Sequence, residues 1–142
     1  MDSSKHIDIG AALLRTGLGA MFIAHALLKY FVFTLAGTAQ FFQSLGLPGA
    51  LGYAVFAAEL VGGGLLILGV YTRVVAFALL PVVIGATWAH AGNGWLFTAP
   101  KGGWEYPAFL ALVTLVVGVL GGGRYALAAD SSDASSVRLQ RA

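Results

Sequence analysis

The sequence lacks cysteine and has few charged residues. The absence of cysteine excludes a disulfide framework, a thiol relay and an iron–sulfur cluster bound by this chain. Lys, Arg, Asp and Glu make up only 10% of the 142 residues, whereas a soluble domain usually contains about 25%. Hydrophobic residues make up 58%, and the mean hydropathy is +0.85. This balance indicates an integral membrane protein with little mass outside the bilayer.

Motifs of soluble enzymes are absent as well. We find no dinucleotide fingerprint, phosphate-binding loop, zinc motif or nucleophile elbow. The glycine triplets at 62–64 and 121–123 lie inside or at the end of apolar segments, where they indicate helix packing or a helix end. The net charge is +2, and basic residues concentrate near the chain ends. This distribution is typical of membrane topology, so no nucleic-acid partner is expected.

Apolar segments predict an all-α fold, namely an integral membrane four-helix bundle in contact with the lipid bilayer. They cover residues 9–33, 49–70, 74–91 and 106–122, and each is close to the roughly 20 residues needed to cross a hydrocarbon core of about 30 Å. The first run is longer than the apolar part of a cleavable signal, about 7–15 residues, so it should remain as a membrane helix. Residues 1–124 then form a single transmembrane domain, and the polar residues 125–142 form a disordered cytoplasmic tail.

Small residues repeat every four positions in two of these segments. Such rows let helix backbones approach closely where lipid offers no hydrophobic drive. We expect them to pack the bundle, although a homo-oligomer face is an alternative. The rows are Ala54, Ala58 and Gly62 in one segment, and Gly118 and Gly122 in the other.

The link between the first two membrane helices, residues 36–47, is too short and too polar to span the bilayer. Phe41, Phe42 and Leu45 would share one face of a helix, with the glutamines and serine of this stretch on another. This pattern fits a short amphipathic helix in the membrane interface between helices one and two. A simple connecting loop is the alternative.

Lysine and arginine predict the orientation. An even number of membrane helices places both chain ends on one side, together with the turn between the second and third helices. Because positively charged loops stay in the cytoplasm, the side richer in Lys and Arg should be cytoplasmic, with both termini. That side carries Lys5, Arg73, Arg124, Arg138 and Arg141, and the other carries Lys29 and Lys101.

The first membrane helix carries a polar stripe. Arg15, Leu18, Phe22, His25 and Lys29 are spaced by three and four residues, so at about 100° per residue they share one narrow helix face. An ionisable group is costly in hydrocarbon unless it has a partner or lines a polar cavity. The stripe should therefore face the bundle interior. Arg15 and Lys29 can alternatively extend to the two membrane surfaces, but the side chain of His25 is too short.

Glu59, in the second membrane helix, is expected near His25. A rise of about 1.5 Å per residue puts the two side chains at similar depths. His90 and Glu105 lie at the outer ends of the third and fourth helices. We therefore expect these four groups and Lys29 to converge in the outer half of the bundle.

The state of Glu59 is left open by the sequence. It is either ionised and paired, or protonated because removal from water disfavours the charged form. A buried ion pair that only locks the bundle is the alternative to a role in proton transfer or ligand contact. The possible partners are Arg15, His25 and Lys29.

Histidines on different helices also raise the question of a metal or haem. His25 and His90 could provide two axial haem ligands. No further ligand and no binding motif supports this, so neither haem nor a metal site is expected. His90, two positions after Trp88, can also be a simple interfacial residue, and Glu105 can favour a helix dipole without any chemistry.

The ordered set of these stretches resembles the DoxX family of small four-helix bacterial membrane proteins. The stretches are LLRTGLGAMFIAHALLKYF, GTAQFFQSLGLPG, AAELVGGGLLILGVYTRVVAFALLPVVIGATWAH, WEYPAFLALV and GGGRYAL, within residues 9–128. The resemblance implies a multi-pass protein of the bacterial inner (cytoplasmic) membrane. It also implies a redox role, because family members or close relatives are linked to thiosulfate:quinone oxidoreductase and to membrane-associated oxidoreductase complexes.

The functional hypothesis is a redox-system component that binds a quinone or a similar lipophilic redox molecule. His25 and Lys29 would donate hydrogen bonds, and Glu59 would relay a proton. Nothing in the chain evidently carries electrons, so a soluble or membrane partner subunit, or the substrate, would deliver them. The alternatives are a non-catalytic membrane anchor for a soluble oxidoreductase and a small oligomeric transporter. The expected contacts to the bound molecule are Arg15, Phe22, Trp88, His90 and Glu105.

Overall fold

The computed structural model describes residues 3–128, which are helical throughout most of their length. The expected all-α fold is confirmed: this part of the chain has no strand, and one isolated bridge joins Val70 to Ala128. Residues 129–142 of the predicted tail lie outside the described residues. The helices are α1 (Ser3–Phe31), α2 (Leu35–Ser44), α3 (Ala50–Leu68), α4 (Thr72–His90), the short 3-10 helix η1 (Ala91–Asn93) and α5 (Glu105–Leu120).

Three of the helices are long and apolar enough to cross a membrane, namely α1, α3 and α4 with η1. The fourth predicted span corresponds to α5, which has 16 residues and is shorter than the roughly 20 that a full crossing takes. The first predicted span also differs, because α1 begins at Ser3 rather than at Ile9. Pro81 lies inside α4 without ending it.

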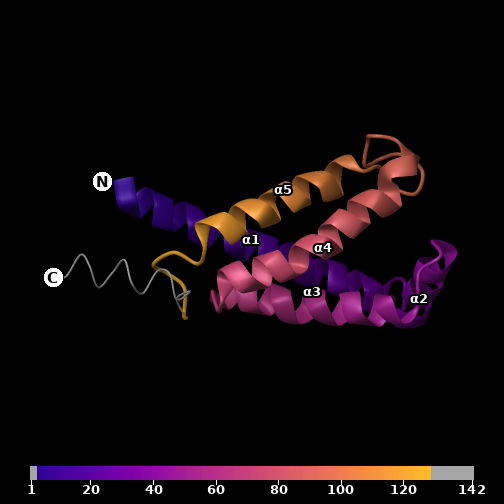
Figure 1. Ribbon diagram of the computed structural model, residues 1–142, viewed down its shortest axis with the longest axis horizontal. Coiled ribbons are helices and arrows are strands. Elements are labelled where there is room, and N and C mark those ends of the chain that lie inside the picture. The colour runs from indigo at the N-terminus through magenta and orange to yellow at the C-terminus, as the bar shows by residue number, and fades with distance from the viewer. Residues whose placement is uncertain (1–2, 129–142) are drawn as a thin grey trace.

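Figure 1 shows the helices as two packed pairs, α1 with α3 and α4 with α5. The start of α1, the α3–α4 turn and the end of α5 lie at one end of the molecule, which we call the closed end. Helix α2 and the α4–α5 loop lie at the other end, where the two pairs diverge, and we call this the open end. A buried apolar core joins the pairs: Leu18, Phe22, Leu66, Ala76, Leu79, Val83, Leu110 and Val117.

The backbones of α1 and α3 approach each other closely at two glycines. A Cβ on Gly19 would lie 2.5 Å from the carbonyl oxygen of Gly63, and a Cβ on Gly63 would lie 2.7 Å from that of Gly19. The predicted packing role is confirmed for Gly62, which faces Leu79 of α4, and for Gly118, which faces Phe77 of α4. Small residues therefore set the helix spacing where apolar surfaces alone would not.

Helix α2 confirms the expected short helix between the first two membrane helices. It begins after Thr34, whose hydroxyl accepts a hydrogen bond from Gly37 N–H at 3.0 Å, as an N-cap side chain does. Helix α2 packs on the start of α3, where Gly52 lies against the backbone of Ala39. Phe41 is 47% exposed.

Candidate functional site

Arg15 is buried at the closed end, where it joins three parts of the chain. Its guanidinium donates from Nη1 to the carbonyls of Leu66 (2.9 Å) and Ile67 in the last turn of α3. Nε donates to Gly122 O (3.2 Å) and Nη2 to Tyr125 O (2.7 Å), both after α5. The last carbonyls of a helix have no partner within the helix, so Arg15 supplies donors where the fold needs them. Arg15 does not meet Glu59.

Glu59, in the middle of α3, pairs with Lys29 in the last turn of α1. The Nζ atom of Lys29 donates to both carboxylate oxygens, at 2.9 Å to Oε1 and 2.7 Å to Oε2. Both side chains are largely removed from solvent, with exposures of 17% for Lys29 and 7% for Glu59. Of the three partners that the sequence allowed, the structure selects Lys29, while His25 is close enough to act on the same carboxylate electrostatically.

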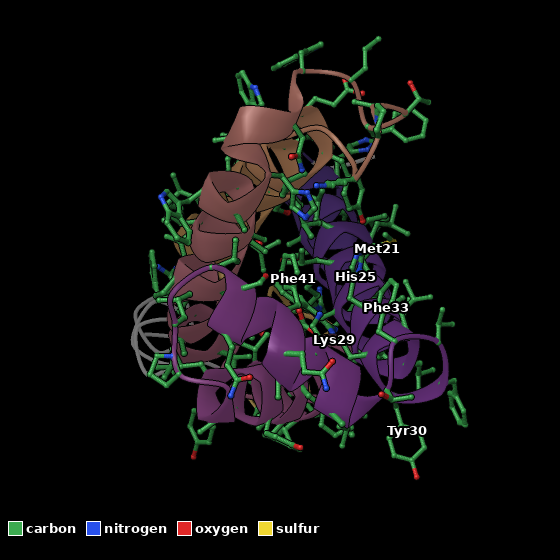
Figure 2. All side chains as sticks on the ribbon, turned by 90° about the vertical axis from the view of Figure 1, so that its right-hand side faces the viewer. Met21, His25, Lys29, Tyr30, Phe33 and Phe41 are labelled. Atoms are coloured by element: carbon green, nitrogen blue, oxygen red, sulfur yellow. The ribbon has the colours of Figure 1, made fainter. Side chains whose placement is uncertain are left out.

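His25 lies one turn before Lys29 on the same face of α1, and both face the space between the helix pairs (Figure 2). Its Nδ1 atom is 2.8 Å from the carbonyl oxygen of Met21. The imidazole also stacks on Tyr106 of α5, with ring centroids 5.7 Å apart and an angle of 18° between the planes. This contact links the two helix pairs at the open end.

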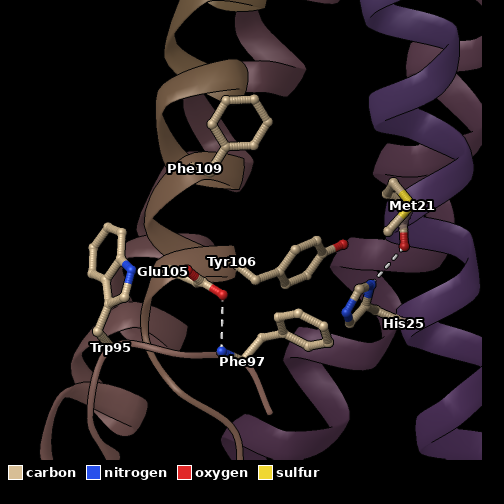
Figure 3. Close-up of a pocket in the computed structure, with 7 residues that line it drawn as sticks. All are labelled: Met21, His25, Trp95, Phe97, Glu105, Tyr106 and Phe109. Carbon is tan, nitrogen blue, oxygen red and sulfur yellow. Dashed lines mark hydrogen bonds between the residues drawn. The ribbon is translucent and has the colours of Figure 1, made fainter. Parts of the chain in front are cut away.

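A cleft of about 700 Å³ opens between α1, the start of α5 and the α4–α5 loop (Figure 3). We call it the α1–α5 cleft. Its walls are mostly aromatic, and its polar groups come from His25, Glu105 and Tyr106. The lining residues are Met21, His25, Trp95, Phe97, Glu105, Tyr106 and Phe109.

Tyr106 supplies a buried polar atom to this cleft. Its hydroxyl is shielded from solvent and has no hydrogen-bond partner among the described residues. Figure 3 shows this hydroxyl directed across the cleft toward α1, on the side of Met21 and His25. Buried hydroxyls almost always have a partner, so the orphaned Tyr106 hydroxyl marks a place where a ligand atom can bind.

The α4–α5 loop that closes one side of the cleft is held by His90 and Glu105. Nδ1 of His90 lies 3.1 Å from the carbonyl oxygens of both Lys101 and Gly102. The carboxylate of Glu105 accepts a hydrogen bond from Phe97 N–H at 3.0 Å (Figure 3). Glu105 therefore lines the cleft and also positions Phe97, whereas His90 shapes the loop from outside the cleft.

Two residues expected as an aromatic wall lie elsewhere. Phe22 is 1% exposed and belongs to the core between the pairs. Trp88 is 58% exposed and lines a second, separate groove of about 540 Å³ with residues of α4 and α5. The structure thus brings together His25, Lys29 and Glu59, with Glu105 at the far wall, and separates them from Phe22 and Trp88.

The aromatic walls of the cleft are residues that sequence reasoning did not assign to a site. Tyr106 was predicted as part of a membrane helix and as an interfacial anchor beside Glu105, and Phe97 as part of a loop. Met21 and Phe109 carry no motif at all. The position of Tyr106 directly after Glu105 was a usable signal for its place in the site, because both residues fall in the first turn of α5. The depth argument that placed Glu105 at the open end places Tyr106 there too.

The residues gathered here can do two things chemically. The cleft can bind a flat apolar molecule between aromatic rings, and His25 with Tyr106 can exchange hydrogen bonds with polar atoms of that molecule. Among residues 3–128, no group of three or more His, Cys, Asp or Glu side chains is arranged to hold a metal ion.

Comparison with known proteins gives a family and a relative. A protein-family model described as DoxX matches residues 10–92. The chain is 41% identical over 83 residues to "Putative oxidoreductase CatD" of Bacillus subtilis (strain 168). That alignment covers 58% of this chain and 60% of the relative, so the chain spans less than two thirds of the relative's length. No solved structure matches the chain.

Proposed function

The chain belongs to the DoxX family of membrane proteins, and on this premise we propose that it is the membrane component of a redox system that binds a quinone in the α1–α5 cleft. The observation that carries the proposal is the buried, unpartnered hydroxyl of Tyr106 in an aromatic cleft. The similarity to a protein named as an oxidoreductase supports the redox part.

A quinone fits the chemistry of the cleft. Its ring is flat and apolar and carries carbonyl oxygens that accept hydrogen bonds, so it needs aromatic walls and polar groups at its edge. Phe97 and Phe109 provide apolar walls, and Tyr106 provides a donor. When bound, a quinone supplies two-electron and two-proton redox chemistry.

The Lys29–Glu59 pair has a supporting role in this proposal. Glu59 does not line the cleft, but its ion pair with Lys29 lies one helical turn from His25 on α1. Lys29 neutralises the carboxylate and orients it through both oxygens.

Because the chain has no cysteine and no dinucleotide-binding motif, we assign the electron donor to a partner subunit or to the substrate.

The same proposal places the protein in the bacterial inner membrane with the closed end in the cytoplasm. Lys5, Arg73 and Arg124 lie at or next to that end, whereas Lys29 and Lys101 lie toward the open end. Lys and Arg are enriched in cytoplasmic loops. A reporter that is active only in the cytoplasm should be active when it is fused after Ala128. Activity of a periplasmic reporter at the same position would overturn the orientation.

Photoaffinity labelling tests the binding site. The protein in lipid nanodiscs is irradiated with an azido-quinone, and labelled peptides are mapped by mass spectrometry. We expect saturable labelling at Met21, Phe97 or Phe109 that unlabelled quinone prevents. The second groove, which contains Trp88, serves as an internal control because it is similarly apolar but has no orphaned hydroxyl on its walls.

The result that refutes the proposal is equally concrete. Labelling that does not saturate, and that is spread over lipid-facing residues of both grooves, means that the quinone only dissolves in the bilayer. The protein would then be better explained as a membrane anchor for a redox partner.

A further inference from the structure

The hydrogen bond of His25 fixes which ring nitrogen carries a proton. Nδ1 lies 2.8 Å from Met21 O, and a carbonyl oxygen can only accept, so the hydrogen is on Nδ1. In the neutral imidazole Nε2 is then an acceptor. Figure 3 shows this second nitrogen on the side of the ring that faces Phe97 and Tyr106. The described residues provide no hydrogen bond to Nε2.

Tyr106 presents the opposite function from the neighbouring ring. Its O–H group is a donor with no acceptor among the described residues. The rings of Tyr106 and His25 stack nearly parallel, with centroids 5.7 Å apart and an angle of 18° between their planes. The open acceptor of His25 and the open donor of Tyr106 therefore lie side by side on the same edge of the α1–α5 cleft.

Building on the proposed function, we propose that Tyr106 and His25 form a pair in which Tyr106 anchors an oxygen of the bound ring and His25 distinguishes its two redox states. The hydroxyl of Tyr106 donates to a carbonyl oxygen of the quinone. Nε2 of His25 accepts from a hydroxyl of the hydroquinone. A quinone has acceptors only, whereas each hydroquinone hydroxyl both donates and accepts, so Tyr106 can donate to either state and Nε2 of His25 is matched to the hydroquinone.

Specificity in this pair rests on unpaired groups. A ligand that fails to use the Tyr106 donor leaves it buried without a partner, which costs affinity in addition to the lost bond. The aromatic walls, in contrast, contact both redox states in the same way. Removing Nε2 of His25 should therefore change affinity for the hydroquinone much more than for the quinone.

The test compares apparent affinities for a quinone, its hydroquinone and the O-methylated hydroquinone, which has no donors. Each is measured anaerobically by competition against azido-quinone labelling of the protein in nanodiscs. Tyr106→Phe keeps the ring stack and removes the hydroxyl, and Tyr53→Phe is its control at an exposed tyrosine. His25→Phe removes Nε2, and His6→Phe is its control at an exposed histidine. Helical content and thermal unfolding are recorded for every variant.

We expect Tyr106→Phe to weaken binding of both redox states about fivefold, as the loss of one net hydrogen bond of about 1 kcal/mol does. His25→Phe should weaken hydroquinone binding by a similar factor and change quinone binding little. The O-methylated compound has no donor for Nε2 of His25. Its affinity for the unaltered protein should therefore be no higher than the affinity of hydroquinone for the His25→Phe variant.

Two different failures are distinguishable. Equal weakening of both redox states by His25→Phe would mean that His25 only shapes the cleft, and the pair assignment would be wrong while the quinone site stands. Absence of saturable binding to the unaltered protein would overturn the proposed function and the pair with it.

Discussion

Replacing Arg15 with methionine tests whether this residue stabilises the closed end or contacts a ligand. Arg15→Met keeps a flexible, mostly apolar side chain and removes every donor. The carbonyls of Ile67, Gly122 and Tyr125 then lose the guanidinium. The carbonyl of Leu66 keeps a partner, because it also accepts from Gly69 N–H at 3.2 Å.

The expected loss follows from these bonds. An unsatisfied buried carbonyl costs about 1 kcal/mol or more. Three carbonyls are affected, of which that of Gly122 is buried and those of Ile67 and Tyr125 are part-buried. The variant also avoids the cost of burying a charge, which offsets part of the loss. We therefore expect the free energy of unfolding to fall by about 2–3 kcal/mol. Arg15→Lys should recover only part of this, because one ammonium cannot span carbonyls that a guanidinium fork reaches together.

The assay is reversible unfolding in mixed detergent micelles with increasing sodium dodecyl sulfate, followed by circular dichroism. Arg124→Met is the matched control, because Arg124 is an exposed arginine near the same end and should leave stability unchanged. Azido-quinone labelling of the folded variant should also be unchanged, since Arg15 contacts the last turn of α3 and the residues after α5, whereas the start of α5 lines the α1–α5 cleft. An Arg15→Met protein of full stability, or one that loses labelling without losing stability, would contradict this reasoning.

Two further predictions use the same unfolding assay. Gly19→Ala should destabilise the protein by about 1–3 kcal/mol through overpacking, because its Cβ would lie 2.5 Å from Gly63 O. Gly64→Ala should be neutral, since a Cβ there meets nothing within 4 Å, and equal effects at both glycines would contradict the close α1–α3 crossing. Lys29→Met should cost about 3 kcal/mol by leaving Glu59 buried without its partner. Adding Glu59→Leu should recover most of that loss, whereas simple additivity of the two single effects would argue against the pair.

Much of the fold could be predicted from local patterns. Long apolar runs identified the membrane helices, and the face shared by Phe41 and Phe42 identified α2. The main errors are at boundaries: α1 begins well before the apolar run, because Ser3 to Asp8 continue the helix beyond the hydrophobic stretch. Hydropathy reports where a helix meets lipid, and it is insensitive to where the backbone hydrogen bonds begin.

The candidate site was predicted in part. Placing Lys29, His25 and Glu59 on facing helices at similar depth was sufficient to bring them together. The same depth argument did not exclude Arg15 as a partner of Glu59, although its guanidinium is committed to carbonyls at the closed end. Trp88 was expected at the cleft, but the rotation of α4 turns it into the second groove.

Composition and periodicity alone determined the membrane class, the all-α fold, and the polar stripe of α1, because solvation and helical spacing act on each segment separately. Only the tertiary structure decided that Glu59 pairs with Lys29, that Arg15 joins α1 to the ends of α3 and α5, and that His25 meets Tyr106. Those choices depend on the crossing of α1 and α3 at Gly19 and Gly63 and on how each helix is rotated about its axis. Helix rotation and crossing are fixed by side-chain packing between segments, which no single segment encodes.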